Sequence, residues 1–322
     1  MGATVRKTKQ GTSFNDQPLF ICYTGIDTEL LFTYQQPLPG GASYPLLNSP
    51  TGRSVIKQIY KNLLLLAKKH RCAVILDTIT WVAHRDRAKQ IGINSDQLVT
   101  FNHDAIAIMA EARTNYADTL TLLSAQIGPR ADAYQVLNKM SVNDAYHYHM
   151  AQVQTYSQTD ADIITAATLT YAEEAAGIVL AAKSVNIPVV IAFTVENDGR
   201  LPSGMTLQQA ITLVDQPTNQ YACHFMINCA HPEHFSYLFR QQPWERRIRG
   251  IVVNASRCSH DELDNCATLD AGNPKELGYQ VAELYRHNPQ INVIGGCCGT
   301  NLNHIEQMVK NIKRHPKVPL SN

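Results

Sequence analysis

The feature that most constrains the fold is a regular alternation of short apolar segments with longer helical patterns along the 322 residues of the chain. The apolar segments are predicted strands at Leu19–Tyr23, Ala73–Asp77, Leu120–Ala125, Asp162–Ala166, Pro188–Thr194, His224–Cys229, Gly250–Asn254 and Ile291–Ile294. Each is apolar on both faces, which is typical of parallel strands covered by helices. Helical patterns fall between them, for example at Arg53–His70, Asn143–Gln158, Ala172–Lys183, Leu207–Val214 and Lys275–His287.

Eight such alternations in a chain of this length predict a single-domain α/β protein, a (β/α)8 TIM barrel. A doubly wound open sheet would show the same alternation, but no glycine-rich phosphate fingerprint follows any predicted strand. We expect a polar N-terminal extension at residues 1–18 and the barrel at residues 19–322. The segment Pro37–Pro50 reads as a long loop after the first strand, either a lid over the active site or an inert excursion.

The charge balance points to a small-molecule enzyme. Charged residues make up 17% of the chain and the formal net charge is +1, which argues against nucleic acid or an anionic membrane surface as the partner. No apolar run is long enough to span a membrane, and residues 1–18 lack the apolar stretch of a signal peptide. We therefore expect a cytoplasmic protein, where its eight cysteines point to metal binding or catalysis rather than to disulfides. The oligomeric state is not indicated.

Three cysteines occupy the positions where a barrel places its active site. Cys229 ends the sixth predicted strand, and Cys297 and Cys298 follow the eighth. The C-terminal ends of barrel strands meet at one rim, although 68 positions separate the two motifs. Zinc prefers thiolates in tetrahedral geometry, and three ligands leave the fourth position for a substrate. Adjacent cysteines normally point to opposite faces of a strand, but the glycines of Gly295–Gly299 permit a turn that brings both sulfurs inward.

Other interpretations of these cysteines remain open. They could be buried apolar side chains beside a glycine-rich turn, or Cys297 and Cys298 could form a redox pair. His231 and His234 follow Cys229 closely and are alternative ligands, although His231 before a proline reads more naturally as a loop that enters a helix.

The sequence Gly-Gly-Cys-Cys-Gly-Thr at 295–300, together with the strand-end pair Asn228-Cys229, resembles the homocysteine S-methyltransferase family. Further segments are similar to family motifs: Asp77–Trp81, Gln126–Pro129, and Phe193-Thr194 with Asp198–Leu201. The resemblance implies a zinc-dependent (β/α)8 methyltransferase whose metal is held by Cys229, Cys297 and Cys298. It also implies that the thiol of homocysteine completes the zinc shell and receives a methyl group, giving methionine.

This chemistry has a physical basis. A free alkyl thiol has a pKa of about 8.5, and zinc coordination favours the thiolate that attacks the methyl group. The donor must carry a good leaving group, and the chain leaves no room for cobalamin or folate domains beyond the barrel. We expect a small donor, a sulfonium such as S-methylmethionine or S-adenosylmethionine, with betaine as the quaternary ammonium possibility. Aromatic faces bind such cations, and Trp81 and then Tyr23 are the candidates.

The chain departs from the family pattern at two carboxylates that hold the ammonium group of the acceptor. Tyr23 stands where the family has an aspartate after the first strand, and Ala167 stands where it has a glutamate at the end of the fourth. Asp27, Glu29 and Glu196 are the candidates to replace them.

Two polar residues at strand ends complete the predicted substrate-binding set. Thr78 follows the second predicted strand, and Asn228 precedes Cys229, where it should either satisfy neighbouring backbone groups or orient a metal ligand. The missing carboxylates leave two further functions open: the same zinc chemistry on a different small thiol, or a non-catalytic zinc-binding barrel that senses a ligand.

Overall fold

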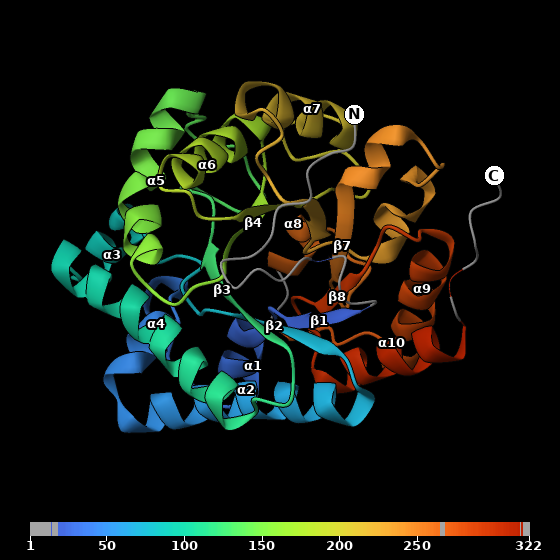
Figure 1. The fold of residues 1–322 in the computed structure, drawn as a ribbon, viewed down its shortest axis with the longest axis horizontal. Coiled ribbons are helices and arrows are strands. Elements are labelled where there is room, and N and C mark those ends of the chain that lie inside the picture. The colour runs from blue at the N-terminus through green and yellow to red at the C-terminus, as the bar shows by residue number, and fades with distance from the viewer. Residues whose placement is uncertain (1–13, 15–18, 265–267, 316, 318–322) are drawn as a thin grey trace.

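The protein forms one closed barrel of parallel strands, each paired with its neighbours in chain order and the last paired with the first. The computed structural model describes residue 14 and residues 19–264, 268–315 and 317. Figure 1 looks into this barrel, with helices arranged around the strands. Within the described residues the strands are β1 (Phe20–Tyr23), β2 (Ala73–Asp77), β3 (Thr121–Ile127), β4 (Ile163–Leu169), β5 (Val189–Phe193), β6 (Phe225–Asn228), β7 (Ile248–Val253) and β8 (Val293–Gly296).

The helices fill the connections between the strands. In the described chain they are α1 (Ile26–Phe32), α2 (Pro50–His70), α3 (Arg85–Gln90), α4 (Ser95–Asn115), α5 (Val142–Ser157), α6 (Ala172–Ser184), α7 (Leu207–Thr218), α8 (His260–Asp264), α9 (Pro274–His287) and α10 (Leu302–Arg314). Short 3-10 helices are η1 (Pro39–Gly41), η2 (Tyr44–Asn48), η3 (Pro232–His234), η4 (Ser236–Leu238) and η5 (Pro243–Arg247). None of the helices that the structure describes is long and apolar enough to cross a membrane.

The predicted barrel is confirmed, and the open-sheet alternative is wrong because β1 pairs with β8. The observed strands lie within about three residues of the predicted ones. The polar extension predicted at residues 1–18 lies outside the described residues except for Phe14. Phe14 is buried against Phe20 and the ring of His224, with ring centroids 5.4 and 4.5 Å away.

Two separate layers of apolar side chains hold the barrel together. Alternate strand residues such as Phe20, Ile75 and Leu122 fill its interior, while their neighbours such as Ile21 and Val74 pack outward under the helices. This division follows from the period of two along a strand, which sends successive side chains to opposite faces. Burial on both faces explains why the strands are apolar throughout.

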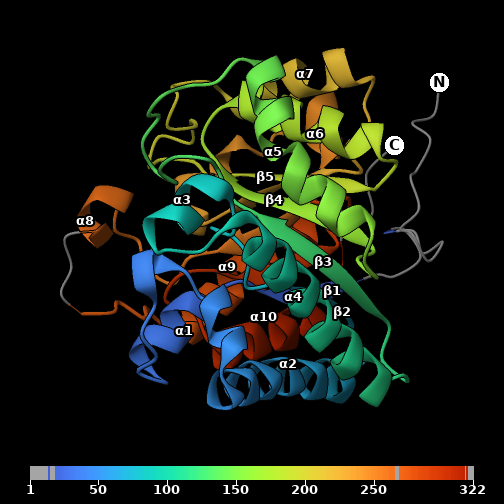
Figure 2. The same cartoon turned by 90° about the vertical axis from the view of Figure 1, so that its left-hand side faces the viewer.

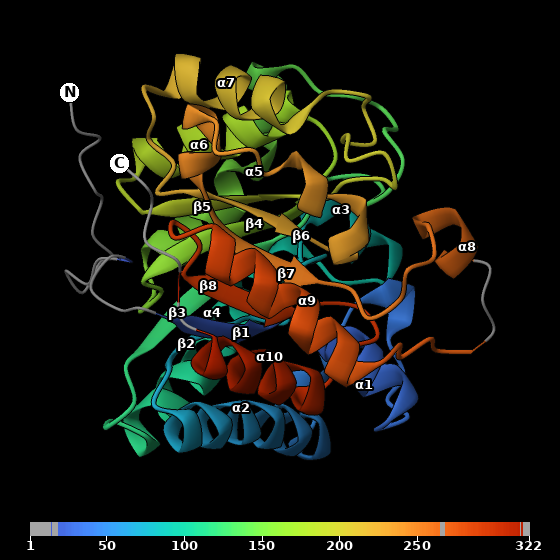
Figure 3. The same ribbon diagram turned by 90° about the vertical axis from the view of Figure 1, so that its right-hand side faces the viewer.

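The register of the last three strands brings the two cysteine motifs to the same height. Asn228 pairs with Val252, and Val253 pairs with Gly296. The backbone N–H groups of Cys229 and Cys297 therefore donate to consecutive carbonyls of β7, those of Val252 (3.0 Å) and Val253 (2.7 Å). Figures 2 and 3 show α1, α3 and α8 gathered at one end of the barrel.

The segment Pro37–Pro50 is packed rather than extended into solvent. It contains η1 and η2, and Tyr44, Leu46 and Leu47 are buried in the layer beneath α2 and α4. Its Ser43 is also buried and hydrogen-bonds to Asp27 of α1. The segment therefore braces α1 at the rim of the barrel.

Candidate metal and substrate site

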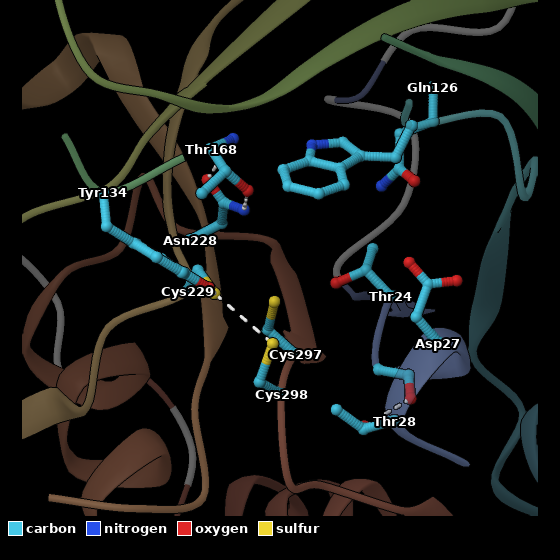
Figure 4. A pocket seen from close by; sticks show the side chains of 12 residues that line it. Thr24, Asp27, Thr28, Gln126, Tyr134, Thr168, Asn228, Cys229, Cys297 and Cys298 are labelled. Atoms are coloured by element: carbon cyan, nitrogen blue, oxygen red, sulfur yellow. Dashed lines mark hydrogen bonds between the residues drawn. The ribbon is translucent and has the colours of Figure 1, made fainter. Parts of the chain in front are cut away.

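A pocket opens at the C-terminal ends of the strands, as shown in Figure 4. Residues from several connections of the rim line it. They are Thr24, Gly25, Asp27, Thr28, Trp81, Gln126, Tyr134, Thr168, Asn228, Cys229, Cys297 and Cys298. This is the place where a TIM barrel is expected to bind its substrates.

Three thiol sulfurs meet on one side of this pocket. The Sγ atoms of Cys229, Cys297 and Cys298 all lie within 4.8 Å of one another, and those of Cys229 and Cys298 are 3.6 Å apart (Figure 4). Sulfurs that bind one zinc ion at about 2.3 Å in tetrahedral geometry lie about 3.8 Å apart. The three thiols could therefore hold a metal ion, and all three of them line the pocket.

The backbone of Cys229 is held in an uncommon conformation that directs its side chain to the other two cysteines. Its φ is +55°, in the left-handed region that costs a non-glycine residue about 1–2 kcal/mol. Two side chains hold this conformation by bonding the Cys229 carbonyl: His260 Nε2 at 2.7 Å and Thr194 Oγ1 at 3.3 Å. Such strain at a rim residue is typical of a functional position.

The glycines around Cys297 and Cys298 act only in part as predicted, since Gly299 lies in a turn while Gly295 and Gly296 do not. Gly295 and Gly296 remain inside β8, so they do not form the expected turn. They permit close packing instead, because a Cβ on Gly296 would lie 2.3 Å from Thr300 Oγ1 and one on Gly295 would lie 2.5 Å from Cys22 Sγ. Of these glycines, Gly299 is the one with a positive φ, +75°.

The three thiols cannot all ionise easily without a cation. Hydrogen bonds from Cys229 and Cys298 hold the pKa of Cys297 well below its usual value. Their hydrogen bonds with Cys297, together with burial, raise the pKa values of Cys229 and Cys298 above the usual range. A divalent cation bound by the three sulfurs would favour the thiolate form of all of them.

Across the pocket from the sulfurs lies the carboxylate of Asp27 (Figure 4). It belongs to the first turn of α1 and accepts a hydrogen bond from the Ser43 hydroxyl. Burial raises its pKa from 3.8 to about 6, since the Ser43 hydrogen bond offsets only part of the loss of hydration. Asp27 is the carboxylate among the described residues that lines this pocket.

Trp81 forms another part of the wall. Its indole Nε1 donates to the Ala167 carbonyl at 3.1 Å, and its own carbonyl accepts from Gly128 N at 2.7 Å. A Cβ on Gly128 would lie 2.5 Å from that carbonyl, so glycine is needed for this approach. The indole is therefore fixed between the ends of β3 and β4.

Asn228 holds the end of β4 in place. Its Oδ1 accepts from Thr168 N at 2.9 Å and its Nδ2 donates to Thr168 Oγ1 at 2.8 Å. Thr168 has φ of +60°, and the pairing of β4 with β5 shifts between Ala166 and Leu169. This irregularity turns Thr168 toward the pocket, while Ala167 is buried and does not line it.

A second polar cluster lies behind Cys229. The Tyr134 hydroxyl is 3.2 Å from Cys229 Sγ, and its ring stacks on His260 with centroids 4.1 Å apart. His260 Nδ1 is 3.2 Å from Glu196 Oε1. Burial opposes a charge on His260, but the bonds to Glu196 and to the Cys229 carbonyl outweigh it and raise the pKa of His260.

The other predicted substrate residues do not line the pocket. The hydroxyl of Tyr23 donates to the Thr300 carbonyl at 3.0 Å, and Glu29 interacts with that same hydroxyl. Thr78 accepts from Gln126 N at 2.8 Å beneath the pocket floor, and Glu196 pairs with His260. These four side chains therefore support the rim from behind.

The two histidines considered as alternative ligands lie outside the cysteine cluster. His231 begins η3 and accepts from Glu233 N at 3.3 Å, as its position before a proline predicts. His234 bonds the Arg257 carbonyl at 3.0 Å. Neither belongs to the group of described residues that could hold a metal ion.

Sequence reasoning missed Thr24, Tyr134, Thr168 and His260. Tyr134 lies in a long connection between β3 and α5, and His260 follows β7 by seven residues, so no strand end marks either of them. Thr168 lies beyond the predicted end of its strand because the bulge extends β4 to Leu169. Only Thr24, one residue after β1, occupied a position that the barrel rule could have identified.

The sequence of the chain matches a known protein family. The family model described as homocysteine S-methyltransferase matches residues 20–312 of the chain. The chain belongs to the homocysteine S-methyltransferase family. It is therefore a methyltransferase, and the resemblance seen in its cysteine motifs is confirmed.

Individual relatives of this methyltransferase are distant. It is similar to homocysteine S-methyltransferase 1 of Brassica oleracea var. italica, with 22% identity over 245 residues, 69% of this chain and 74% of that protein. Its fold is similar to that of the Escherichia coli homocysteine methyltransferase MmuM. The oxidized form of that enzyme has a TM-score of 0.73 at 16% identity, covering 91% of this chain and 96% of that chain. Its metallated form has a TM-score of 0.70 at 17% identity, covering 92% and 97%.

Proposed function

We propose that this methyltransferase is zinc-dependent and transfers a methyl group from a small sulfonium donor to the thiol of homocysteine. The observation that carries the proposal is the arrangement of the pocket. Three thiols converge on one wall, and the Asp27 carboxylate faces them; the described residues that line the pocket include no lysine or arginine. One wall suits a metal-bound thiolate, and the other suits the ammonium group of the same acceptor.

Cys229, Cys297 and Cys298 would hold the zinc ion. The Cys229 and Cys298 sulfurs are 3.6 Å apart, close to the spacing of tetrahedral zinc ligands, and all three lie within 4.8 Å of one another. All-sulfur coordination suits zinc better than magnesium or calcium. When bound, zinc would keep the acceptor sulfur deprotonated and in place for attack on the methyl group. Free thiols at all three positions are consistent with a reducing compartment such as the cytoplasm.

Asp27 would bind the ammonium group of homocysteine. Tyr23 and Ala167, which replace the two family carboxylates, do not line the pocket, so the acceptor must find its counter-ion elsewhere. Asp27 lies four residues after Tyr23, in the first turn of α1, and its carboxylate faces the sulfurs across the cavity. An ammonium there would favour the ionised form of Asp27, which burial alone disfavours.

Trp81 would contact the methyl donor. Its indole is fixed by the Ala167 carbonyl and faces the same cavity. A sulfonium beside such a face gains about 0.5–2 kcal/mol. Attack on the methyl carbon releases a neutral thioether, and the acceptor thiolate becomes a neutral thioether as well.

The second candidate is the same chemistry on a different small thiol. The loss of both family carboxylates favours it, because Asp27, the carboxylate that lines the pocket instead, could bind the cationic group of another acceptor. A matrix of donors (S-methylmethionine, S-adenosylmethionine, betaine) against acceptors (homocysteine, cysteine, a simple alkyl thiol) distinguishes the candidates.

The zinc-loaded protein should contain about one zinc per chain and convert homocysteine to methionine with a sulfonium donor. Cys298→Ala should lose both zinc and turnover while the barrel stays folded, because barrel stability comes from its core. Exposed Tyr279→Phe on α9 is the control. A protein that binds no zinc under reducing conditions, or that methylates no thiol, would contradict the proposal.

A further inference from the structure

We propose that Tyr134 is a positioning residue of the metal site, whose hydroxyl donates a hydrogen bond to the Cys229 sulfur. This inference rests on the proposed function, since it concerns the metal that the cysteines would hold. The hydroxyl oxygen lies 3.2 Å from Cys229 Sγ, on the side of that sulfur away from Asp27 (Figure 4). Among the described residues, Cys229 is the hydrogen-bond partner of this hydroxyl.

The direction of the hydrogen bond follows from the chemistry of a metal ligand. A sulfur that binds a metal is a thiolate and carries no proton, so it can only accept. Tyr134 must then be the donor. A hydrogen bond of this kind withdraws electron density from the thiolate and fixes its orientation, which affects both the metal affinity and the electronic spectrum of the bound ion.

Tyr134 is itself fixed from behind. Its ring stacks on His260 with an interplanar angle of 23°, and that same histidine bonds the Cys229 carbonyl at 2.7 Å. Glu196 holds the other nitrogen of the imidazole at 3.2 Å. His260 therefore holds the backbone of Cys229, while Tyr134 holds its sulfur.

The three side chains come from three connections of the barrel, those after β3, β5 and β7. Cys229 at the end of β6 lies in the middle of them. The three connections are far apart in the sequence, so Tyr134, Glu196 and His260 meet only in the folded barrel. Their cluster is therefore more than the local packing of one loop. Outer partners of this kind typically contribute about 10- to 100-fold in metal affinity.

Tyr134→Phe tests the inference, because it removes one oxygen atom and keeps the stacked ring. Zinc affinity is measured by competition with a chromophoric chelator under reducing conditions. The sulfur-to-metal charge-transfer band is recorded with cobalt(II) in place of zinc. Tyr279→Phe is the matched control, since its side chain is 54% exposed on α9 and does not line the pocket. Thermal unfolding of the metal-free proteins checks that each variant is folded.

We expect Tyr134→Phe to bind zinc about 10- to 100-fold more weakly than the wild type and to shift the cobalt charge-transfer band, with unchanged metal-free unfolding. Tyr279→Phe should match the wild type in both measurements. Wild-type affinity and an unshifted band in Tyr134→Phe would overturn this inference alone and leave the proposed function standing. A wild-type protein that binds neither metal would overturn both.

Discussion

The role of Asp27 can be tested by replacing it with asparagine, which keeps the shape and removes the charge. The carboxylate is the one that the described lining of the pocket offers to an ammonium group. Two unit charges about 4 Å apart interact by about 4 kcal/mol at the effective dielectric constant of a protein surface site. Asp27 is only partly buried, so we discount this figure for solvent screening to about 2–3 kcal/mol. Since each 1.36 kcal/mol is a factor of ten, kcat/KM for homocysteine should fall about 30- to 150-fold.

The assay compares homocysteine with 1-propanethiol, which has a thiol but no ammonium group. Both are followed in the zinc-loaded wild type and in Asp27→Asn with the same sulfonium donor. The kcat/KM for propanethiol should change by less than about threefold, because that acceptor makes no ion pair. Zinc content should be equal in the two proteins, since Asp27 is not one of the clustered thiol residues.

The pH dependence gives an independent reading of the same group. Burial raises the pKa of Asp27 to about 6, so the wild type should lose homocysteine activity as the pH falls through about 6 and Asp27 is protonated. The pH profile of Asp27→Asn should lack this fall in activity at acidic pH. If the substitution lowers the activity on both thiols equally, or on neither, Asp27 does not bind the ammonium group and our interpretation of the pocket is wrong.

Three further outcomes are expected. Because the folded-state pKa of Asp27 lies above its unfolded value, its charge costs stability above about pH 6 and nothing at low pH. Asp27→Asn should therefore raise the unfolding free energy of the metal-free protein by about 1–3 kcal/mol near pH 8 and by much less near pH 4; an equal gain at both would contradict this. Trp81→Leu should raise KM for the sulfonium donor about 2- to 30-fold and leave the acceptor's KM nearly unchanged, while Trp81→Phe should lose less; a larger effect on the acceptor would place the indole at the wrong substrate. Asn228→Ala removes both hydrogen bonds that hold Thr168 at positive φ, so urea unfolding should show a loss of about 2–4 kcal/mol, and an unchanged midpoint would mean that Thr168 keeps its conformation unaided.

The barrel was predictable because its evidence is repeated eight times along the chain. Each strand is short, apolar and followed by a helical pattern, and an error of two residues at one end does not change the count. Strands such as Ala73–Asp77 were identified with their correct bounds. The long helix α4 was not recognised, although Asn94 and Gln97 form a capping box at its start. Its polar composition hides the apolar stripe that faces the core.

The metal site was predictable for a different reason. A barrel brings all strand ends to one rim, so Cys229 and the cysteine pair after β8 had to lie near one another once the strands were placed. No such rule identifies the residues that line the substrate-binding side of the pocket. Whether Asp27 or Tyr23 faces the cavity depends on where α1 begins, and Thr168 faces it because of a bulge that leaves no mark in the sequence.

The position of β8 links the maturation of the site to the order in which the chain is made. β8 closes the barrel by pairing with β1, and the two residues that follow it are Cys297 and Cys298. During synthesis, Cys229 emerges with β6, and Cys297 follows only after 68 more residues have been added. Until then β1 and β7 are open sheet edges, which other chains could pair with. Barrel closure and the assembly of the three sulfurs thus depend on the same last strand, so the three-thiol cluster forms only when the sheet is complete.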